Sequence, residues 1–323
     1  MRAVVCPRPE GIGALEIRDL PVPEPGAGEI RIRVVAAGVN FADTLAISGR
    51  YQERPPLPFV PGLELAGTVD ALGPGVDGPP PGTPVVAVVD HGAYAEFAVA
   101  RAVDVVPLPA GLPAEVAAGF PVTYGTAHGA LVWRAGLRPG ETVLVHGAAG
   151  GSGLAAVECA RVLGARVIAT ARGEARLALA RAHGAHEVLD ADDPELVTRI
   201  RTLAPEGVHV AFDPVGGAMF RASLRTVAWE GRILVIGFAS GEVPQIPANH
   251  LLVKNAAAVG FYWGSYRRHD PGRVRAGLAT LLDWWRAGRL RPEVARRYPL
   301  ARVREALEDL RARRVAGKIV LLP

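Results

Sequence analysis

The segment Thr142–Arg176, TVLVHGAAGGSGLAAVECARVLGARVIATARGEAR, decides how the chain folds. It starts with the apolar run Val143–Val145, which is typical of a buried parallel strand. A glycine-rich turn, His146–Gly153, comes next, and the small and apolar residues Leu154–Leu163 that follow predict a helix. A second strand at Arg166–Thr170 completes a βαβ unit, the building block of a doubly wound sheet.

The glycine-rich turn has the composition of a dinucleotide-binding site. Glycine lets the backbone approach a pyrophosphate closely, and the following helix N-terminus offers free N–H groups and the positive end of its dipole. The spacing fits the G-x-G-x-x-G fingerprint with one alanine substituted, in one of two frames: Ala148, Gly150, Gly153 or Gly151, Gly153, Ala156. A turn that only caps a helix is the alternative, but the strand–helix–strand setting favours a dinucleotide.

The end of the second strand favours NADPH over NADH. NAD-specific units carry Asp or Glu about 20 residues after the turn, to bind the ribose 2′-hydroxyl, whereas Thr170 stands here. Arg172 and Arg176 follow, and if this segment opens the next helix, their spacing puts them on one face of it. Guanidinium groups suit a 2′-phosphate, since each charged hydrogen bond contributes roughly 1.5–3 kcal/mol. The alternative is two solvated surface arginines, with Glu174 between them as a counter-argument.

Length and composition indicate two globular domains. The chain has 323 residues, half of them apolar and 21% charged, which is too long for one typical core. No apolar run approaches the ~20 residues that span a bilayer, and the N-terminal MRAVVCPRP lacks the apolar core of a signal peptide. We therefore expect a cytoplasmic protein that does not bind membranes.

Cysteine count and charge exclude further classes. Cys6 and Cys159 are the only cysteines, too few for a disulfide framework or a four-cysteine zinc site. The net charge of +4 is uneven, because residues 264–323 hold 15 Lys and Arg against 6 Asp and Glu. A basic segment can contact nucleic acid, yet this one carries no recognition motif. A solvated helix face explains it more simply, so we expect no nucleic-acid partner.

The pattern changes along the chain. Residues 1–122 read as short strands between Pro- and Gly-rich turns, typical of a small β-barrel, with strands at Arg2–Cys6, Leu15–Asp19, Glu29–Val39, Glu64–Leu72, Pro84–Val89, Ala93–Val99 and Val103–Pro107. Helices are expected at Asn40–Gly49 and, in two pieces, at Leu112–Trp133. From Thr142 strands and helices alternate, which predicts a parallel, doubly wound sheet. The short last strand, Lys318–Leu322, is expected to pair with the first domain.

Several motifs together resemble the medium-chain dehydrogenase/reductase superfamily and, within it, the zinc-free quinone oxidoreductase branch that includes zeta-crystallin. They cover nearly the whole chain: GVNFADTLAISGRY (Gly38–Tyr51), PGLELAGTVDALGPGV (Pro61–Val76), GAYAEF (Gly92–Phe97), TYGTAHGAL (Thr123–Leu131), the glycine-rich turn and FDPVGG (Phe212–Gly217). The resemblance implies an α/β protein with a GroES-like β-barrel catalytic domain (residues 1–122 and 290–323) and a Rossmann NADPH-binding domain (residues 123–289). It also implies a homodimer through the Rossmann domain, with Ala239–Gly260 at the interface.

The same resemblance bears on metal use. Zinc-dependent relatives place a catalytic Cys at the position of Asn40 and a catalytic His at that of Leu63. Neither side chain is a usual zinc ligand, so we expect no metal. Without a Lewis acid to lower the pKa of an alcohol, alcohol oxidation is disfavoured.

The resemblance also implies site residues. Asn40, Tyr51 and Thr126 are the catalytic candidates, although Asn40 also suits a helix N-cap. The substrate pocket is expected to contain Tyr51, Phe59 and Tyr262. The cofactor is expected to meet Asn40, Thr126, Gly150, Gly151, Ser152, Thr170, Arg172, Arg176, Gly237, Phe238, Phe261, Trp263 and Lys318.

These features predict an NADPH-dependent, zinc-independent quinone oxidoreductase. A quinone accepts a hydride or a single electron because the charge spreads onto oxygen, and the protein must align donor and acceptor. Two alternatives stay open. One is a reductase of enoyl or 2-alkenal double bonds on the same scaffold, and the other is a cofactor-binding structural or RNA-binding protein.

The two arginines after the second strand generate a first prediction. Replacing Arg172 by Asp and Arg176 by Ala should remove the preference for NADPH over NADH, because the 2′-phosphate loses its cationic partners. The ratio of kcat/KM for the two cofactors measures the effect. An unchanged ratio would show that these arginines are only solvated.

Overall fold

The computed structural model describes all 323 residues, and its internal contacts divide the chain into two units. Unit 1 comprises Met1–Val122, Tyr266–Asp283 and Pro292–Pro323, and unit 2 comprises Thr123–Ser265 and Trp284–Arg291. No helix in the structure is both long enough and apolar enough to cross a bilayer.

The segment Tyr266–Asp283 belongs to unit 1, whereas the sequence-based boundaries place it in the second domain. Arg267 explains the difference. Its guanidinium is buried between two carboxylates of unit 1, with Nη1 2.8 Å from Asp90 Oδ1 and Nη2 2.9 Å from Asp104 Oδ2. Such a pairing between distant segments leaves no periodic signal in the sequence.

Unit 2 contains the predicted doubly wound sheet. Its six strands are all parallel, in the order β10-β9-β8-β11-β12-β13. The strands are β8 (Thr142–Val145), β9 (Arg166–Ala171), β10 (Glu187–Asp190), β11 (Val208–Asp213), β12 (Val227–Val235) and β13 (Ala257–Gly260). The order reverses between β8 and β11, which is where open α/β sheets bind their ligands. The prediction of a parallel, doubly wound sheet is therefore confirmed.

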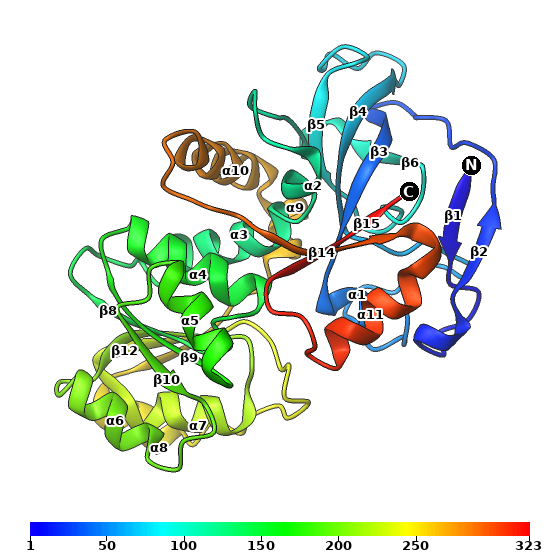
Figure 1. Ribbon diagram of the computed structural model, residues 1–323. Coiled ribbons are helices and arrows are strands. Elements are labelled where there is room, and N and C mark those ends of the chain that lie inside the picture. Colours follow the sequence, from blue (N-terminus) through cyan, green and yellow to red (C-terminus); the bar gives the residue numbers. More distant parts are fainter. The chain divides into compact units, whose positions relative to one another are not determined.

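Helices cover both faces of this sheet. Helices α4 and α5 lie on one face and α6 and α7 on the other (Figure 1). The helices are α3 (Pro121–His128, which begins in unit 1), α4 (Gly151–Val162), α5 (Glu174–Ala182), α6 (Leu196–Leu203), α7 (Gly217–Thr226) and α8 (Ala248–Lys254), with a π-helical turn at Gly129–Arg134. One layer of the core packs Leu144, Ile168 and Ile233 of the sheet against Ile200 and Phe220.

Unit 1 is built mainly from antiparallel strands. Its seven-stranded sheet has the order β14-β15-β3-β4-β5-β7, with β6 also paired to β3, and β1 and β2 form a separate pair. The strands are β1 (Arg2–Val5), β2 (Glu16–Asp19), β3 (Glu29–Val39), β4 (Glu64–Leu72), β5 (Pro84–Val88), β6 (Phe97–Arg101), β7 (Val105–Pro107), β14 (Val294–Pro299) and β15 (Lys318–Leu322). The first half of β3 alternates buried and more exposed residues, as one solvated face requires.

The helices of unit 1 are short apart from one. They are α1 (Phe41–Ala46), α2 (Ala114–Ala118), α9 (Trp263–His269, which begins in unit 2), α10 (Pro271–Arg286, which ends in unit 2) and α11 (Val303–Arg311), with 3-10 turns at Ile12–Ala14, Ala102–Asp104 and Leu300–Arg302.

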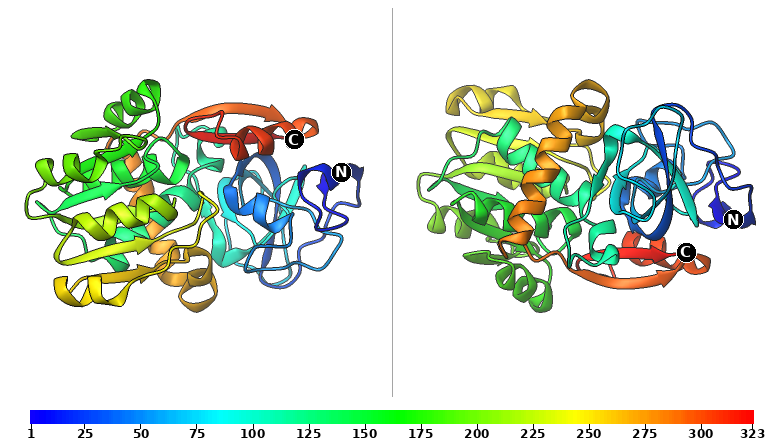
Figure 2. Two further views of the ribbon diagram at one scale, coloured as in Figure 1. Left: turned by 90° about the horizontal axis from the view of Figure 1, so that it is seen from below. Right: turned by 90° about the horizontal axis from the view of Figure 1, so that it is seen from above.

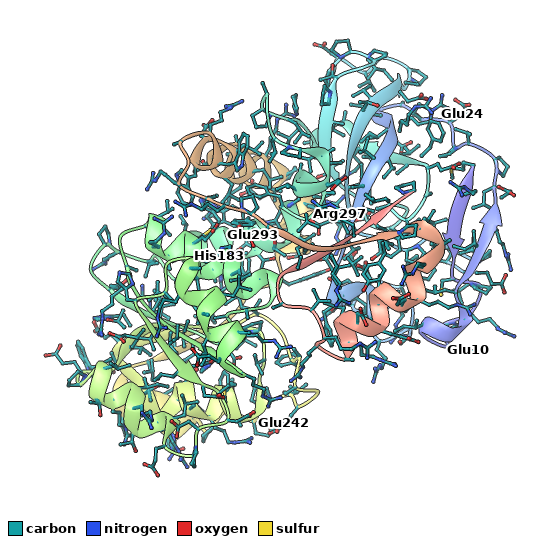
Figure 3. The ribbon with its side chains drawn as sticks, viewed as in Figure 1. Glu10, Glu24, His183, Glu242, Glu293 and Arg297 are labelled. Carbon is teal, nitrogen blue, oxygen red and sulfur yellow. The ribbon has the colours of Figure 1, made fainter.

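The last strand pairs as predicted. β15 lies antiparallel to β3, with Val320 opposite Gly38, and its other edge pairs with β14. Figure 2 shows this C-terminal segment, in red, beside the blue strands of unit 1. β14 itself was not predicted, because its sequence VARRYP has no apolar alternation and most of the strand is exposed. Arg297 of β14 (Figure 3) forms an ion pair with Glu115 of α2.

One predicted strand of unit 1 lies elsewhere. The sequence places it at Ala93–Val99, but β6 runs from Phe97 to Arg101. The residues before it make only an isolated bridge, between Ala95 and Ala3, and the Tyr94 N–H donates to the Pro61 carbonyl. Tyr94 is therefore free to turn its side chain into the interior of the unit.

Candidate functional site

A buried polar cluster lies where three strands of unit 1 meet. Asn40 follows β3, Glu64 starts β4 and Lys318 starts β15, and these strands are neighbours in the order β15-β3-β4. All three side chains are buried. The structure thus brings together Asn40 and Lys318, two of the predicted site residues, and adds Glu64. The clue in the sequence was a charged residue at the start of an apolar strand, Glu64 in PGLELAG.

An ion pair forms the centre of the cluster. Lys318 Nζ lies 2.6 Å from Glu64 Oε1 and 2.7 Å from Asn40 Oδ1, and Asn40 Nδ2 donates to Glu64 Oε1 over 2.8 Å. The Val122 backbone N–H donates to the other carboxylate oxygen, Oε2, over 2.8 Å. A buried ion pair needs such additional hydrogen bonds to compensate the loss of water. The amide orientation of Asn40 is set by these charges, because its oxygen must face the ammonium group.

Two glycines make room for the cluster. A Cβ atom on Gly38 would lie 2.4 Å from both Glu64 Oε1 and the Ala118 carbonyl oxygen. A Cβ atom on Gly119 would lie 2.5 Å from Cγ of Lys318. The charged groups are therefore packed directly against backbone, which holds them in one arrangement.

A second pair of residues extends the cluster. Asp43 Oδ2 accepts the backbone N–H of Asn40 and the hydroxyl of Tyr94, each over 2.7 Å. Its other oxygen, Oδ1, is buried without a hydrogen-bond partner. Burial raises the pKa of Asp43 to about 7, against the opposing effect of its donors, Tyr94 and the Asn40 N–H. Burial also raises the pKa of Tyr94 well above its usual value.

The glycine-rich turn of unit 2 is shaped for a phosphate group. Gly147 has a left-handed backbone with φ +60°, and a Cβ on Gly153 would lie 2.2 Å from the Gly147 carbonyl oxygen. Helix α4 starts at Gly151 with Gly150 as its N-cap, and no side chain caps it. The first-turn N–H groups therefore face outward without a side-chain acceptor, as an anion at a helix N-terminus requires. Gly150, Gly151 and Ser152 thus fit the pyrophosphate of a dinucleotide.

Other predicted cofactor residues of unit 2 divide into two groups. Gly237 and Phe238 follow β12 at the same end of the sheet as the glycine-rich turn, and Phe238 is partly exposed. Phe261 and Trp263, by contrast, are buried. Phe261 stacks edge-on against Trp133, and the Trp263 ring lies on Gly125, next to the half-buried Thr126. The roles of all five predicted cofactor residues stay predictions.

Thr170 lies beneath the surface at the end of β9. Its hydroxyl is 2.8 Å from Nδ1 of His146, whose Nε2 is 3.0 Å from the hydroxyl of Ser223, and all three are fully buried. Burial lowers the pKa of His146, so its ring is neutral at pH 7. The Thr170 hydroxyl thus bonds a buried side chain next to the glycine-rich turn. Because it is fully buried, direct contact of this hydroxyl with a cofactor is not favoured.

The two arginines proposed for the 2′-phosphate lie on either side of Gly173, the N-cap of α5, so Arg172 precedes the helix and only Arg176 belongs to it. Arg172 is exposed and Arg176 is half-buried, and Arg176 Nη1 donates to the Arg172 carbonyl over 3.4 Å. Arg172 also forms an ion pair with Asp192. The guanidinium groups are therefore placed to meet an anion at the end of β9.

The predicted substrate-pocket residues are differently placed. Tyr51 is half-buried in the loop after α1, and Glu53 in this loop pairs with Arg268 of α9 over 2.8 Å. Phe59 belongs to the hydrophobic core of unit 1, with 6% of its surface exposed, so little of it is accessible to a substrate. Tyr262, in unit 2, is half-buried next to α9.

A small pocket lies elsewhere in unit 2. It has a volume of about 230 Å³ and is lined by Glu158, Arg161, Ala182, His183, Gly184, Gly288 and Arg291. His183 (Figure 3) follows α5, and its Nδ1 lies 2.8 Å from Glu158 Oε1. Glu158 Oε2 accepts the hydroxyl of Tyr124 over 2.8 Å. The polar groups that line the pocket thus bond to neighbouring side chains of the protein. We therefore assign the pocket a structural role and do not treat it as a candidate active site.

Asp43 generates a prediction on stability. Its folded-state pKa of about 7 is far above the ordinary 3.8, so the native state binds a proton that the unfolded chain releases. The free energy of unfolding should therefore fall as pH rises from about 4 to 7, by up to about 4 kcal/mol. Asp43→Asn should flatten this slope, measured by urea unfolding at several pH values. Tyr94→Phe, which removes a donor to the carboxylate, should shift the transition to higher pH. Equal slopes in all three proteins would contradict the assignment.

Two family models match the chain, one in its N-terminal part and one in its C-terminal part, and the second includes residues 266–282 of unit 1. Residues 26–110 match the alcohol dehydrogenase GroES-like domain, and residues 151–282 match the zinc-binding dehydrogenase family. Quinone oxidoreductase-like protein 2 of Rattus norvegicus is 38% identical over 99% of this chain and 91% of its own length. The quinone oxidoreductase of Lama guanicoe is 33% identical over 100% of this chain and 97% of its own.

Solved structures agree with the sequence matches. A mycobacterial protein complexed with NADPH superposes with a TM-score of 0.94 at 37% identity, and covers 100% of both chains. The quinone oxidoreductase of Escherichia coli, also complexed with NADPH, gives 0.93 at 28% identity with the same coverage. The expected combination of a GroES-like domain and a Rossmann-like sheet is thereby confirmed. This chain belongs to the medium-chain dehydrogenase/reductase superfamily, in its quinone oxidoreductase branch.

Proposed function

We propose that the protein is an NADPH-dependent quinone oxidoreductase that works without zinc. The observation that carries the zinc-free part is the Lys318 ammonium group, 2.7 Å from Asn40 Oδ1. Asn40 stands where zinc-dependent members of the superfamily place a catalytic cysteine, and a fixed cation there disfavours a second one. No group of three or more His, Cys, Asp or Glu side chains is suited to a metal. The donor groups at this position thus favour chemistry without a Lewis acid.

The residues of unit 2 fit NADPH. The glycine-rich turn offers uncapped N–H groups at Gly151 and Ser152 for the pyrophosphate. Arg172 and Arg176 offer cations for the 2′-phosphate, and no acidic residue ends β9 to select NADH. Two similar structures are described as complexes with NADPH, which supports the same cofactor here. When bound, NADPH supplies a hydride, and a quinone is an acceptor that needs no metal.

The chain's own groups then have positioning roles. The Lys318–Glu64 pair holds the Asn40 amide in one orientation, and we assign this amide and the hydroxyl of Thr126 to the nicotinamide side of the cofactor. Preorganised polar groups of this kind cost no reorganisation during the reaction. Tyr51 Oη can hold the proton that the reduced acceptor takes up, with solvent as the other source.

An acceptor screen tests the activity. At fixed NADPH, kcat/KM should be higher for a benzoquinone or a naphthoquinone than for a 2-alkenal or an enoyl thioester, because a quinone needs only alignment with the hydride donor. Initial rates of NADPH oxidation at 340 nm provide the measurement. A kcat/KM for the alkenal a hundredfold above every quinone would instead identify a double-bond reductase.

Two controls accompany the screen. Turnover should be unaffected by a chelator, and elemental analysis should find no tightly bound zinc; one zinc per chain would contradict the zinc-free part alone. Salt-sensitive RNA binding with negligible turnover of every acceptor would contradict the enzymatic part and favour a binding protein.

We also propose that the protein works as a homodimer in the cytoplasm. Strand β13 is the last strand of its sheet and pairs only with β12, so one edge has unpaired backbone groups. Beside it in the chain, Leu252 and Val253 of α8 are 75% and 71% exposed, and Val243 is exposed as well. Exposed apolar side chains in the segment that precedes an edge strand favour an interface between copies. Glu242 (Figure 3), in the same segment of the chain, pairs with Arg221 over 2.5 Å.

The dimer proposal has a direct test. Light scattering should give twice the chain mass of 33.9 kDa. Leu252→Glu with Val253→Glu should give the monomer, because two charges from each chain would be buried at the interface. Ile17→Glu is the matched control, since Ile17 is an exposed apolar residue of unit 1. A monomeric wild type, or a dimeric double variant, would place any interface elsewhere.

A further inference from the structure

The arginine proposed to bind the 2′-phosphate already has a carboxylate partner. Arg172 Nε lies 3.0 Å from Oδ1 of Asp192. Arg172 follows β9 and Asp192 follows β10, and these strands are parallel neighbours with Ala171 opposite Asp190. Both side chains are exposed, at 57% and 64%, so the pair lies open to solvent at the carboxyl end of the sheet.

A network of backbone bonds holds the carboxylate in position. Asp190 Oδ1 accepts the backbone N–H of Asp192 over 3.0 Å, and Asp190 Oδ2 accepts that of Gly173 over 3.3 Å. Gly173 is the N-cap of α5. Asp190 therefore ties the turn that bears Asp192 to the start of the helix that follows Arg172. The ion pair is thus between two anchored segments.

The local charge is unfavourable for a phosphate. Arg172 and Arg176 contribute two positive charges, while Glu174, Asp190 and Asp192 contribute three negative ones. A 2′-phosphate brings nearly two further negative charges near neutral pH, and it is attracted to the same guanidinium whose Nε Asp192 already engages. Carboxylate and phosphate therefore compete for Arg172.

We propose that Asp192 is a specificity-determining residue that holds Arg172 and so weakens the preference for NADPH over NADH. The inference rests on the proposed function, in which Arg172 meets the 2′-phosphate. Asp192 occupies the Nε donor of Arg172 and repels a phosphate, so phosphate binding to Arg172 has to overcome this carboxylate. The protein then discriminates less between the two cofactors than its arginine pair alone would allow.

The size of the effect follows from the exposure of the pair. Asp192→Asn should tighten NADP⁺ binding about fivefold at low salt, equivalent to about 1 kcal/mol at 1.4 kcal/mol per tenfold change. NAD⁺ affinity should change less than about twofold, because NAD⁺ has no 2′-phosphate. The gain should shrink at high ionic strength, since exposed charges are screened. Titration calorimetry with NADP⁺ and NAD⁺ measures all three quantities without turnover.

Two comparisons make the test specific. Glu187→Gln is the matched control. Glu187 lies in β10 and pairs with Arg166, so its substitution removes one negative charge that does not contact Arg172. Its effect on NADP⁺ affinity should be clearly smaller. In an Arg172→Ala background, Asp192→Asn should lose most of its effect on NADP⁺ affinity, because the guanidinium for which carboxylate and phosphate compete is absent.

The outcomes separate this inference from the function. An unchanged NADP⁺ affinity in Asp192→Asn, an equal gain for NAD⁺, or the full gain in the Arg172→Ala background would overturn the role of Asp192, even if quinone turnover is intact. Arg172→Ala should itself weaken NADP⁺ more than NAD⁺; if it does not, the inference also fails. Absent quinone turnover with the expected affinities would contradict the proposed reaction and leave the role of Asp192 standing.

Discussion

The buried ion pair between Lys318 and Glu64 is the contact on which the candidate site in unit 1 depends. It joins the first residue of the last strand to the first residue of β4 across β3. Removal of one member of such a pair leaves an uncompensated charge and typically costs 3–5 kcal/mol. The pair therefore couples the pairing of the chain's C-terminal strand to the orientation of Asn40, since the same ammonium group bonds both residues.

The candidate cofactor site of unit 2 is built mainly from backbone groups and not from a buried ion pair. The glycine-rich turn places N–H donors by close packing, and the turn after β11 uses Asp213, whose Oδ1 accepts the N–H groups of Val215 and Gly216 over 2.8 and 2.9 Å. Buried side chains such as His146 and Thr170 support the turn from below and are uncharged at neutral pH. Buried hydrogen bonds between His146, Thr170 and Ser223 thus lie next to the glycine-rich turn.

Local sequence signals predicted most of the fold. The strands of unit 2 were found because buried parallel strands are continuous apolar runs, and the turn was found because glycine is required where backbone approaches backbone. β14 was missed, since an exposed, Arg-rich edge strand has no apolar pattern. Glu64 and Lys318 are 254 residues apart, so their pairing leaves no trace in spacing. For the same reason Lys318 was placed by family resemblance and Glu64 was not placed at all. The cofactor and substrate roles of individual residues stay predictions.

The two ion pairs of the candidate site differ in what controls them. Lys318 and Glu64 are almost fully buried, so dissolved salt barely screens their attraction. Titration of the adjacent Asp43 changes the charge next to this cluster. Arg172 and Asp192 are exposed, so ionic strength acts on them directly. A change in pH near 7 should therefore act first on the residues around Asn40, while a change in salt should act first on cofactor affinity. The two ion pairs lie in different units of the chain.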